Sequence, residues 1–369
     1  MAGIKEYKCP NCGGALEFDA KLQKLKCPFC DSEFEMSQFT EVDGDSMSAE
    51  EDHGEDASAQ HADFETPSDN SWSDSEKDQM MIYTCQSCGG EVIASKERGA
   101  DRCPYCGNNV IVASQFSGGI RPDYVLPFMK TKKEAIELLR QHIGKYPFAP
   151  AEFSLDETLE KTEGIYIPFW LFDAKANFDM NYEVTRPGGH LVQGDYEIEI
   201  INHYNVHKAG TGDFVMVPAD ASRRMADDLM DSLEPFDLSK RVKFDMGYLA
   251  GYLADRYDVT AEENEPRVNK RMEMTIRDSV RDSIKEAATP RGGDIRIFDG
   301  MAYYAMVPVW LMTVRFKDDV YHYAVNGQTG RTIGEIPYDS RAFVRYLLKH
   351  FGIYSAIAIP LIFAFMYFS

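Results

Sequence analysis

The eight cysteines of this 369-residue chain all lie within its first 106 residues, in two clusters with identical spacing. In each cluster a Cys-x-x-Cys pair is followed, after 14 residues, by a second such pair, and every cysteine is used. Two residues between thiolates allow a tight turn to aim both sulfurs at one ion. Four thiolates in a tetrahedral array suit Zn²⁺, with iron as the main competitor. We therefore predict two zinc sites, formed by Cys9, Cys12, Cys27 and Cys30 and by Cys85, Cys88, Cys103 and Cys106.

Each predicted site belongs to a small zinc ribbon, at 1–36 and 82–114. A Gly pair follows the first Cys-x-x-Cys of each ribbon, at 13–14 and 89–90, where we expect positive φ. Four protein ligands leave no position for water, so we expect two structural Zn²⁺ ions that supply most of the folding free energy of the ribbons. A redox role for the Cys-x-x-Cys pairs is less favoured, because thioredoxin-like sites occur singly on a βαβ frame.

The net charge of −21 argues against an extended surface for nucleic-acid phosphates. Neither ribbon is a basic patch, so protein contact is the expected role. Nucleic-acid binding by the ribbons remains the alternative. The N-terminus has no apolar stretch that could serve as a secretory signal, so we expect the bulk of the chain in the cytoplasm, where disulfides are not expected.

An acidic segment at 37–81 separates the two ribbons. Between Glu41 and Met80 there are 14 Asp or Glu residues and one Lys, together with seven Ser. Such a composition predicts a disordered linker, because little apolar surface is available to offset the entropy of ordering. Phe64 and Trp72 lie inside it and are interpreted as incidental aromatics or, alternatively, as a short docking motif.

Residues 115–340 are predicted to form an α+β cytoplasmic body. The Thr131-x-x-Glu134 capping box and an apolar stripe predict a helix that ends near Gly144. A second helix is expected from Ser154, and others over 222–233, 247–254 and 272–287. Strands are expected over 164–172, 177–184, 196–206, 213–217, 321–324 and 331–336, the last two joined by an Asn-Gly turn.

The body carries a repeated pattern. A Pro-x-Trp apolar run ends at Trp170 and again at Trp310, each time after a helix and before polar-alternating segments. We therefore expect a duplicated helix-plus-antiparallel-sheet unit with halves at about 120–218 and 258–340.

Catalytic motifs are absent from the sequence. There is no phosphate-binding Gly-rich loop, no HExxH and no GxSxG. His190, His203, His207 and His322 lie in strand-like segments and are interpreted as surface or packing residues. Trp170 and Trp310 are interpreted as core anchors. No enzymatic activity is expected.

The C-terminal region, 343–369, is predicted to be a membrane anchor. From Phe351 to Ser369 there are 19 residues without a formal charge, enough helix to cross a bilayer. Arg341, Arg345 and Lys349 precede this run and favour a cytoplasmic location for everything upstream. A buried core helix or a peripheral hairpin is the alternative interpretation.

The chain resembles a family of bacterial membrane-anchored proteins with tandem transcription-factor-IIB-type zinc ribbons. The resemblance rests on the paired Cys-x-x-Cys-Gly-Gly ribbons and on the segments GIYIPFWLFDA at 164–174, EPFD at 234–237, GYLAGYLADRYDV at 247–259 and YHYAVNGQTGRTIGEIP at 321–337. Members are often labelled primosomal helicase-like, but this sequence has no helicase motor motif. The resemblance implies a membrane scaffold that recruits flotillin-like and phage-shock-protein-A-like partners in envelope stress.

These observations predict a non-enzymatic adaptor that recruits protein partners to the cytoplasmic face of a membrane. The alternative is a membrane-tethered regulator that binds nucleic acid through its zinc ribbons.

Overall fold

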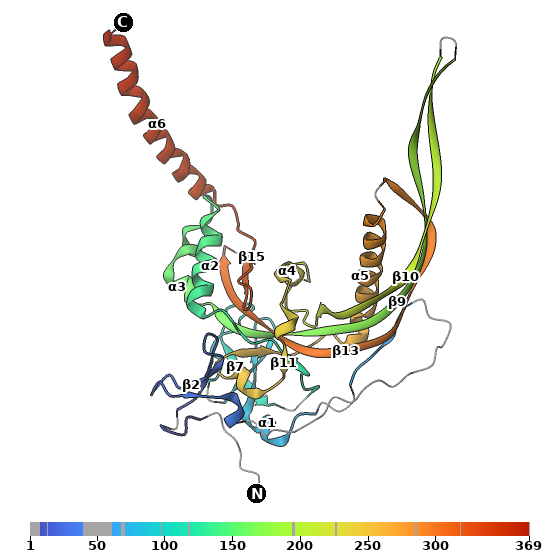
Figure 1. The fold of residues 1–369 in the computed structure, drawn as a ribbon. Coiled ribbons are helices and arrows are strands. Elements are labelled where there is room, and N and C mark those ends of the chain that lie inside the picture. The colour runs from blue at the N-terminus through green and yellow to red at the C-terminus, as the bar shows by residue number, and fades with distance from the viewer. Residues whose placement is uncertain are drawn as a thin grey trace.

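The fold is mixed α+β and is built on one large sheet (Figure 1). The structure is a computed structural model that describes residues 8–368, apart from 13, 40–60, 68–70, 97, 117–118, 194–195, 226, 285 and 318. A three-stranded sheet near the N-terminus consists of β1 (Glu17–Asp19), β2 (Lys24–Lys26) and β3 (Glu33–Phe34), followed by the short helix η1 (Met36–Gln38).

The large sheet has twelve strands, among which the order β11-β8-β13-β9-β12-β6-β5-β7 forms a continuous path. β10 pairs with β9, β14 pairs with β13 and β15, and β4 pairs with β13. Its members are β4 (Phe64–Glu65), β5 (Met80–Cys85), β6 (Glu91–Ser95), β7 (Val110–Gln115), β8 (Tyr124–Val125), β9 (Glu163–Gln193), β10 (Tyr196–Asp220), β11 (Val242–Lys243), β12 (Leu253–Asp255), β13 (Ala288–Phe316), β14 (Asp319–Asn326) and β15 (Thr332–Gly334).

Helices lie around this sheet. They are α1 (Asp74–Gln79), α2 (Lys132–Gly144), η2 (Ala151–Ser154), α3 (Asp156–Leu159), α4 (Asp227–Leu233), η3 (Leu238–Lys240), η4 (Met246–Leu249), α5 (Ala261–Asp282) and α6 (Ser340–Phe368). The capping box predicted at the start of α2 is present, with Glu134 accepting from the backbone and hydroxyl of Thr131. The predicted cap at Ser154 is wrong, because Ser154 ends η2 and Leu155 precedes α3 without a side-chain cap.

The two Pro-x-Trp runs lie side by side at the centre of the sheet. β9 and β13 pair antiparallel, which places Tyr166 opposite Pro308 and Trp170 opposite Tyr304. Trp170 and Trp310 are both buried, so the interpretation as core anchors fits their surroundings.

Each indole also supports the start of a helix. Trp170 Nε1 donates to the carbonyl oxygen of Val259 at 2.9 Å, directly before the Thr260 cap of α5. Trp310 Nε1 donates at the same distance to the carbonyl oxygen of Lys130, directly before the cap of α2. Trp170 therefore holds the start of α5, the helix that precedes Trp310, and Trp310 holds the start of α2, the helix that precedes Trp170.

Several predicted strands are parts of longer ones. The strands predicted over 164–172 and 177–184 belong to β9, and those over 196–206 and 213–217 belong to β10. β9 and β10 form a long hairpin that projects from the body beside α5 (Figure 1). β9 continues through Pro187 and Gly188. Beyond Val184 it pairs only with β10 among the described strands, so its other edge needs no backbone donor, and a proline or a bulge can be accommodated there.

The helix predicted over 247–254 is wrong in its second half. η4 ends at Leu249, and Leu253–Asp255 form β12. β12 pairs parallel with β9 and antiparallel with β6. Partners distant in sequence therefore decide its conformation, and β12 joins the second cysteine cluster to the main sheet.

The acidic segment is not a free linker over its whole length. Residues 40–60, which carry much of its charge, lie outside the described residues. After them, Phe64 pairs with Gly300 of β13, and α1 begins with a complete capping box at Ser73. Trp72 is buried against Phe116 and Phe244. The part of the segment described after residue 60, at 61–67 and 71–81, is therefore docked on the body, with Phe64 and Trp72 buried in the contact.

α6 leaves the body near α2 and projects away from it (Figure 1). Within the described residues, no helix combines the length and the apolar character needed to cross a membrane, so the prediction of a spanning helix is not supported there. The predicted anchor covers 343–369. The side chains of its last part, 363–369, lie outside the described part of the structure.

Candidate metal centres

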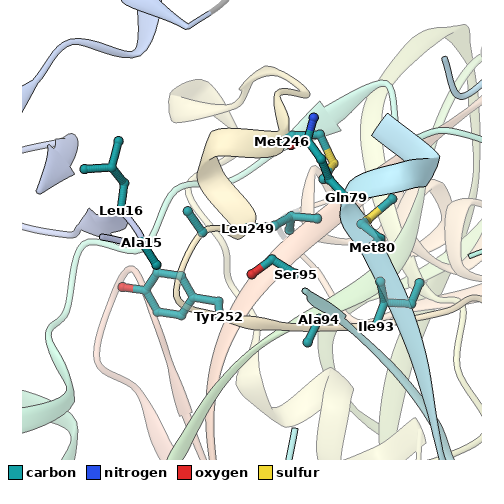
Figure 2. Close-up of a pocket in the computed structure, with 11 residues that line it drawn as sticks. Ala15, Leu16, Gln79, Met80, Ile93, Ala94, Ser95, Met246, Leu249 and Tyr252 are labelled. Atoms are coloured by element: carbon teal, nitrogen blue, oxygen red, sulfur yellow. The ribbon is translucent and has the colours of Figure 1, made fainter. Parts of the chain in front are cut away.

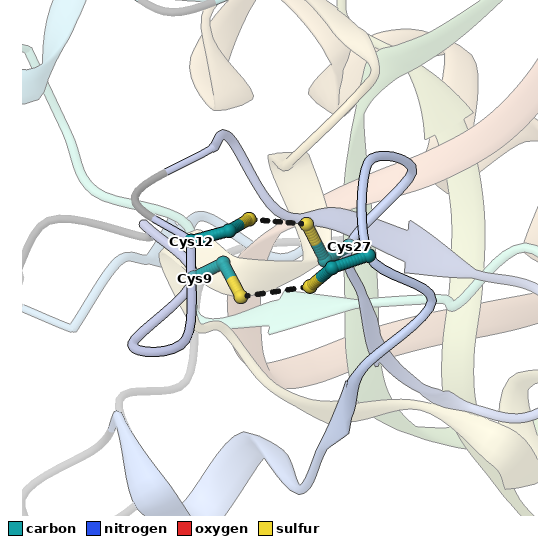
Figure 3. Close-up of side chains that lie close together, drawn as sticks. Cys9, Cys12 and Cys27 are labelled. Carbon is teal, nitrogen blue, oxygen red and sulfur yellow. Dashed lines mark hydrogen bonds between the residues drawn. The ribbon is translucent and has the colours of Figure 1, made fainter.

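The first cysteine cluster joins two turns of the first ribbon. Cys9 and Cys12 come from the turn before β1, and Cys27 and Cys30 from the turn between β2 and β3 (Figure 3). The Sγ atoms of Cys9 and Cys30 are 3.5 Å apart and those of Cys12 and Cys27 are 3.4 Å apart. All four Sγ atoms lie within 4.8 Å of one another.

The second cluster repeats this arrangement. The Sγ atoms of Cys85 and Cys106 are 3.3 Å apart, those of Cys88 and Cys103 are 3.6 Å apart, and all four again lie within 4.8 Å of one another. A disulfide would need about 2.05 Å between sulfurs. Four sulfurs about 2.3 Å from a central Zn²⁺ would be separated by about 3.8 Å, close to the observed spacing. Each cluster can therefore hold a metal ion, and its donor set suits zinc.

The backbone explains why this spacing recurs. In every Cys-x-x-Cys turn, the N–H of the first cysteine donates to the carbonyl oxygen five residues later: Cys9 to Gly14, Cys27 to Ser32, Cys85 to Gly90 and Cys103 to Asn108, at 2.7–2.9 Å. The residue before that acceptor has positive φ in three of the four turns, at Asp31, Gly89 and Gly107.

The glycine prediction can be compared with these turns. Gly89 has a φ of 70°, as predicted, whereas Gly14 and Gly90 do not have positive φ. Gly13 lies outside the described residues. The positive φ at Asp31 and Gly107 belongs to the second turn of each ribbon, where no positive φ was predicted.

Local polar groups tune the thiols differently. The hydroxyl of Ser32 lies 3.2 Å from Cys30 Sγ and lowers the pKa of Cys30 to about 6. Burial raises the pKa of Cys103, although the backbone amides of Cys106 and Tyr105 oppose this effect. A buried thiol of this kind becomes a thiolate at neutral pH when a cation supplies the compensating charge, which favours metal binding over a free reactive thiol.

The second ribbon is part of the main sheet. Its strands β5, β6 and β7 pair with one another, and β6 pairs with β12. Tyr105, inside the second Cys-x-x-Cys, is 5% exposed, and its hydroxyl donates to Asp255 Oδ2 of β12 at 2.5 Å. Ser222 Oγ donates to the same oxygen at 2.7 Å, and the Arg256 N–H donates to Asp255 Oδ1. The second Cys-x-x-Cys turn of this cluster is thus fixed to the core by a buried carboxylate.

Burial also changes the ionisation of this carboxylate. It raises the pKa of Asp255 to about 6, although the three hydrogen bonds partly oppose the effect by stabilising the anion. This network could not be predicted from the sequence, because Tyr105 and Asp255 are 150 positions apart.

The first ribbon is packed on the body rather than free on a tether. The Phe18 N–H donates to Ala250 at 3.0 Å, Tyr252 donates to the Phe18 carbonyl, and Gln23 donates to the Phe128 carbonyl. Figure 2 shows the junction, where Ala15 and Leu16 of this ribbon face side chains of β5, β6 and η4 across a small pocket. Its volume of about 20 Å³ corresponds to roughly one water molecule, so the junction is closely packed.

The two ribbons differ in the aromatic residue of their second turn. Phe29 occupies the same place between Cys27 and Cys30 as Tyr105 between Cys103 and Cys106. Phe29 is 75% exposed, whereas Tyr105 is buried. One turn therefore faces solvent while its counterpart is used for docking.

The histidines do not gather into a site. His203 and His207 lie on the exposed hairpin, where they contact Glu183 and Asp179, and His190 lies 3.7 Å from Glu197. His322 is placed elsewhere, with Nδ1 3.2 Å from Thr313 Oγ1, and burial lowers its pKa. Among the described residues, the two cysteine clusters are the groups that bring three or more candidate ligands together.

The chain is similar to a curated bacterial protein along most of its length. Over 336 residues the chain is 29% identical to the uncharacterized protein YdjG of Bacillus subtilis (strain 168), with 90% of each protein covered. No protein-family model and no solved structure matches the chain. The chain is thus similar to YdjG along most of its length, and the resemblance to membrane-anchored zinc-ribbon proteins stays a prediction.

Proposed function

We propose that this chain is a non-enzymatic adaptor that attaches to the cytoplasmic face of a membrane through α6 and recruits a protein partner through its first zinc ribbon. In this account both metal ions are structural, because four cysteine ligands complete a tetrahedral shell and leave no position for a reacting water. The second ribbon joins the body, and the first ribbon presents a binding surface.

The exposed Phe29 is the observation that carries the partner-binding proposal. Phe29 is 75% exposed and lies on a turn held by the backbone hydrogen bonds from Cys27 to Ser32 and from Asp31 to Cys27. An aromatic side chain on such a turn presents apolar area at little cost in conformational entropy. Phe29 lies against Gly14, where a Cβ atom would approach its ring to 2.5 Å. The glycine thus leaves the ring room to lie across the turn. The net charge of −21 favours a protein partner over nucleic acid.

The membrane proposal rests on the surface of α6. Phe351, Tyr354 and Leu361 are between 64% and 70% exposed, on a helix that projects from the body (Figure 1). Such a row of large apolar side chains is unfavourable in water, and basic residues at Arg341, Arg345 and Lys349 precede it. The sequence resemblance offers flotillin-like and phage-shock-protein-A-like proteins as the first partners to test.

The repeated Trp–helix contacts support a duplicated body. Each Pro-x-Trp strand follows a helix with a Thr-x-x-Glu capping box. The indole of each half donates to the backbone carbonyl directly before the capping box in the opposite half. We infer that the two halves arose from one helix-plus-strand unit. In the adaptor account their pairing forms the rigid frame from which the ribbon and α6 project.

The partner test uses the full chain with Phe29→Ala. Proteins captured from solubilised membranes are quantified for the parent chain, for Phe29→Ala and for Leu22→Ala, which changes another exposed apolar residue of the same ribbon. We expect one or more partners to be depleted at least tenfold by Phe29→Ala and retained by Leu22→Ala, with the metal content unchanged. Equal capture by all three proteins would refute the role of this turn.

The membrane test removes the exposed part of α6. A chain that ends at Lys349 keeps Phe343 and Tyr346, which pack on Phe148 and hold the first turns of the helix. We expect this chain to leave the membrane fraction while keeping its metal ions. A full-length Ile357→Asp variant, changed at an exposed position, should be partly released. If both variants stayed in the membrane fraction, α6 would not be the attachment site.

A further inference from the structure

We propose that the free edge of β10 binds the same edge of a second copy of this chain, so that two hairpins join in one antiparallel sheet. The proposal concerns Tyr196–Lys208, the outer part of β10, called the arm edge below. It is independent of the membrane and partner proposals.

The arm edge is a long row of unpaired backbone groups. β10 pairs with β9 on one side, and no described strand pairs with its other side. At about 3.4 Å per residue the arm edge extends about 40 Å. A free edge of this length is a template for another strand unless charge, proline, a bulge or a covering element blocks it.

The opposite edge of the arm is less suited to pairing. Over Thr185–Gln193 this edge is formed by β9, which carries Pro187 with a bulge beside it and Gly189 at a φ of 120°. Closer to the body it is formed by β13. There β13 carries Pro290, and a register shift lies between Pro290 and Gly292. Gly292 and Gly293 have φ values of 123° and 142°, and Arg291 and Asp294 add charge. The arm edge contains no proline and no residue with positive φ. A register shift lies beside Ile200 and Ile201, but its extra residue, Gly188, belongs to β9, so the arm edge itself is continuous. The two edges therefore differ in the features that prevent pairing.

Apolar side chains are exposed along the arm edge. Tyr196, Ile198, Ile200, Ile201 and Tyr204 are between 40% and 77% exposed. A two-stranded hairpin is marginally stable in water by itself, and a third strand would cover part of this surface. These side chains and the free backbone groups lie on the same strand, which favours edge-to-edge pairing.

Charge favours an identical strand as the occupant. The arm edge carries Glu197, Glu199 and Lys208 within a chain whose net charge is −21, so it is a nearly neutral surface where two acidic copies can approach. In a closed dimer a two-fold axis relates the two copies. When two antiparallel edge strands pair in one sheet, this axis is perpendicular to the sheet, and one residue lies opposite the same residue of the second copy.

An axis at Asn202 gives a favourable register. It places Glu197 opposite His207 of the second copy, Ile198 opposite Val206, and Ile200 opposite Tyr204. Each of these pairs occurs twice by symmetry, and no like charges meet. Cross-strand apolar and opposite-charge pairs are those that stabilise antiparallel sheets.

The test uses the full chain in mild detergent and two cysteine variants of the same residue type. Asn202→Cys would lie opposite itself at about 5 Å between Cα atoms, within the range for a disulfide. Asn205→Cys on the same exposed strand would be about 20 Å from its copy. We expect the parent chain to sediment as a dimer, and mild oxidation to cross-link Asn202→Cys at least tenfold faster than Asn205→Cys or the parent.

A second pair of variants separates the edge from the apolar face. Ile200→Asp, on the arm edge, should convert the dimer to a monomer. Leu191→Asp, on the neighbouring β9, should leave it dimeric, because Leu191 is exposed beside the edge strand but does not form its free edge. A monomeric parent chain, equal cross-linking at 202 and 205, or a dimer that survives Ile200→Asp would each overturn the proposal.

Discussion

Replacing Tyr105 by Phe tests how the second metal centre is joined to the body. The substitution removes one hydroxyl and keeps the ring that packs beside Cys103 and Cys106. The lost hydrogen bond runs from the Tyr105 hydroxyl to Asp255 Oδ2 at 2.5 Å, in a fully buried setting. Asp255 keeps its bonds from Ser222 and from the Arg256 N–H.

The magnitude follows from the charge of the acceptor. Burial raises the pKa of Asp255 to about 6, so the carboxylate is ionised at pH 8 and largely neutral at pH 5. A hydrogen bond to a buried charged group contributes about 1.5–3 kcal/mol, and one between neutral groups about 1 kcal/mol. Tyr105→Phe should therefore lower the free energy of unfolding by about 2 kcal/mol at pH 8 and by about 1 kcal/mol at pH 5.

The assay is thermal unfolding of parent and variant at both pH values, with the metal content measured in each sample. At pH 8 the variant should unfold a few degrees below the parent, and the gap should shrink at pH 5. Phe29→Tyr, at the equivalent exposed position of the first ribbon, should leave the transition unchanged. An equal loss at both pH values, or no loss in fully metal-loaded protein, would refute the assigned role of Asp255.

Three further predictions concern the buried groups of the body. The folded-state pKa of Asp255 is above its ordinary value, so ionisation of Asp255 opposes folding and the free energy of unfolding falls as pH rises through about 6. Asp255→Asn should remove this fall between pH 5 and 7.5 in metal-loaded protein. A fall that persists in the variant would contradict the assignment. Trp72→Ala removes a buried ring from Phe116 and Phe244, so it should cost about 3–5 kcal/mol and make 61–79 sensitive to protease before the rest of the chain; unchanged digestion would show that this segment is not docked. Trp310→Phe removes the indole bond at the start of α2 and should cost about 1 kcal/mol by denaturant unfolding, whereas a neutral result would mean that the bond does not hold the helix start.

Features set by neighbouring residues could be predicted from the sequence. The Cys-x-x-Cys turns, the capping box of α2 and the positive φ at Gly89 depend on contacts within a few positions, so spacing and residue type were sufficient. The repeat of the Pro-x-Trp run is visible in the sequence, but the antiparallel pairing of the two runs with each other was not predicted from it.

Features set by distant partners could not be predicted. Leu253–Asp255 form a strand because β6 and β9 accept them, and a short apolar run has no periodicity that excludes a helix. The acidic segment was judged by its average composition, whereas its second part is docked by particular residues, among them the buried Phe64 and Trp72 and Glu76, which pairs with Arg121. Phe29 and Tyr105 occupy equivalent positions, and only the body beside Tyr105 distinguishes the exposed aromatic from the buried one.

The central claim is that both cysteine clusters hold structural zinc in a closed shell. Metal analysis combined with X-ray absorption at the zinc edge, on the purified full chain, tests it most directly. The account predicts two zinc ions per chain, each with four sulfur ligands at about 2.3 Å and no oxygen or nitrogen ligand. Fewer than two metal ions, iron in place of zinc, or a zinc ion with a water ligand would contradict it.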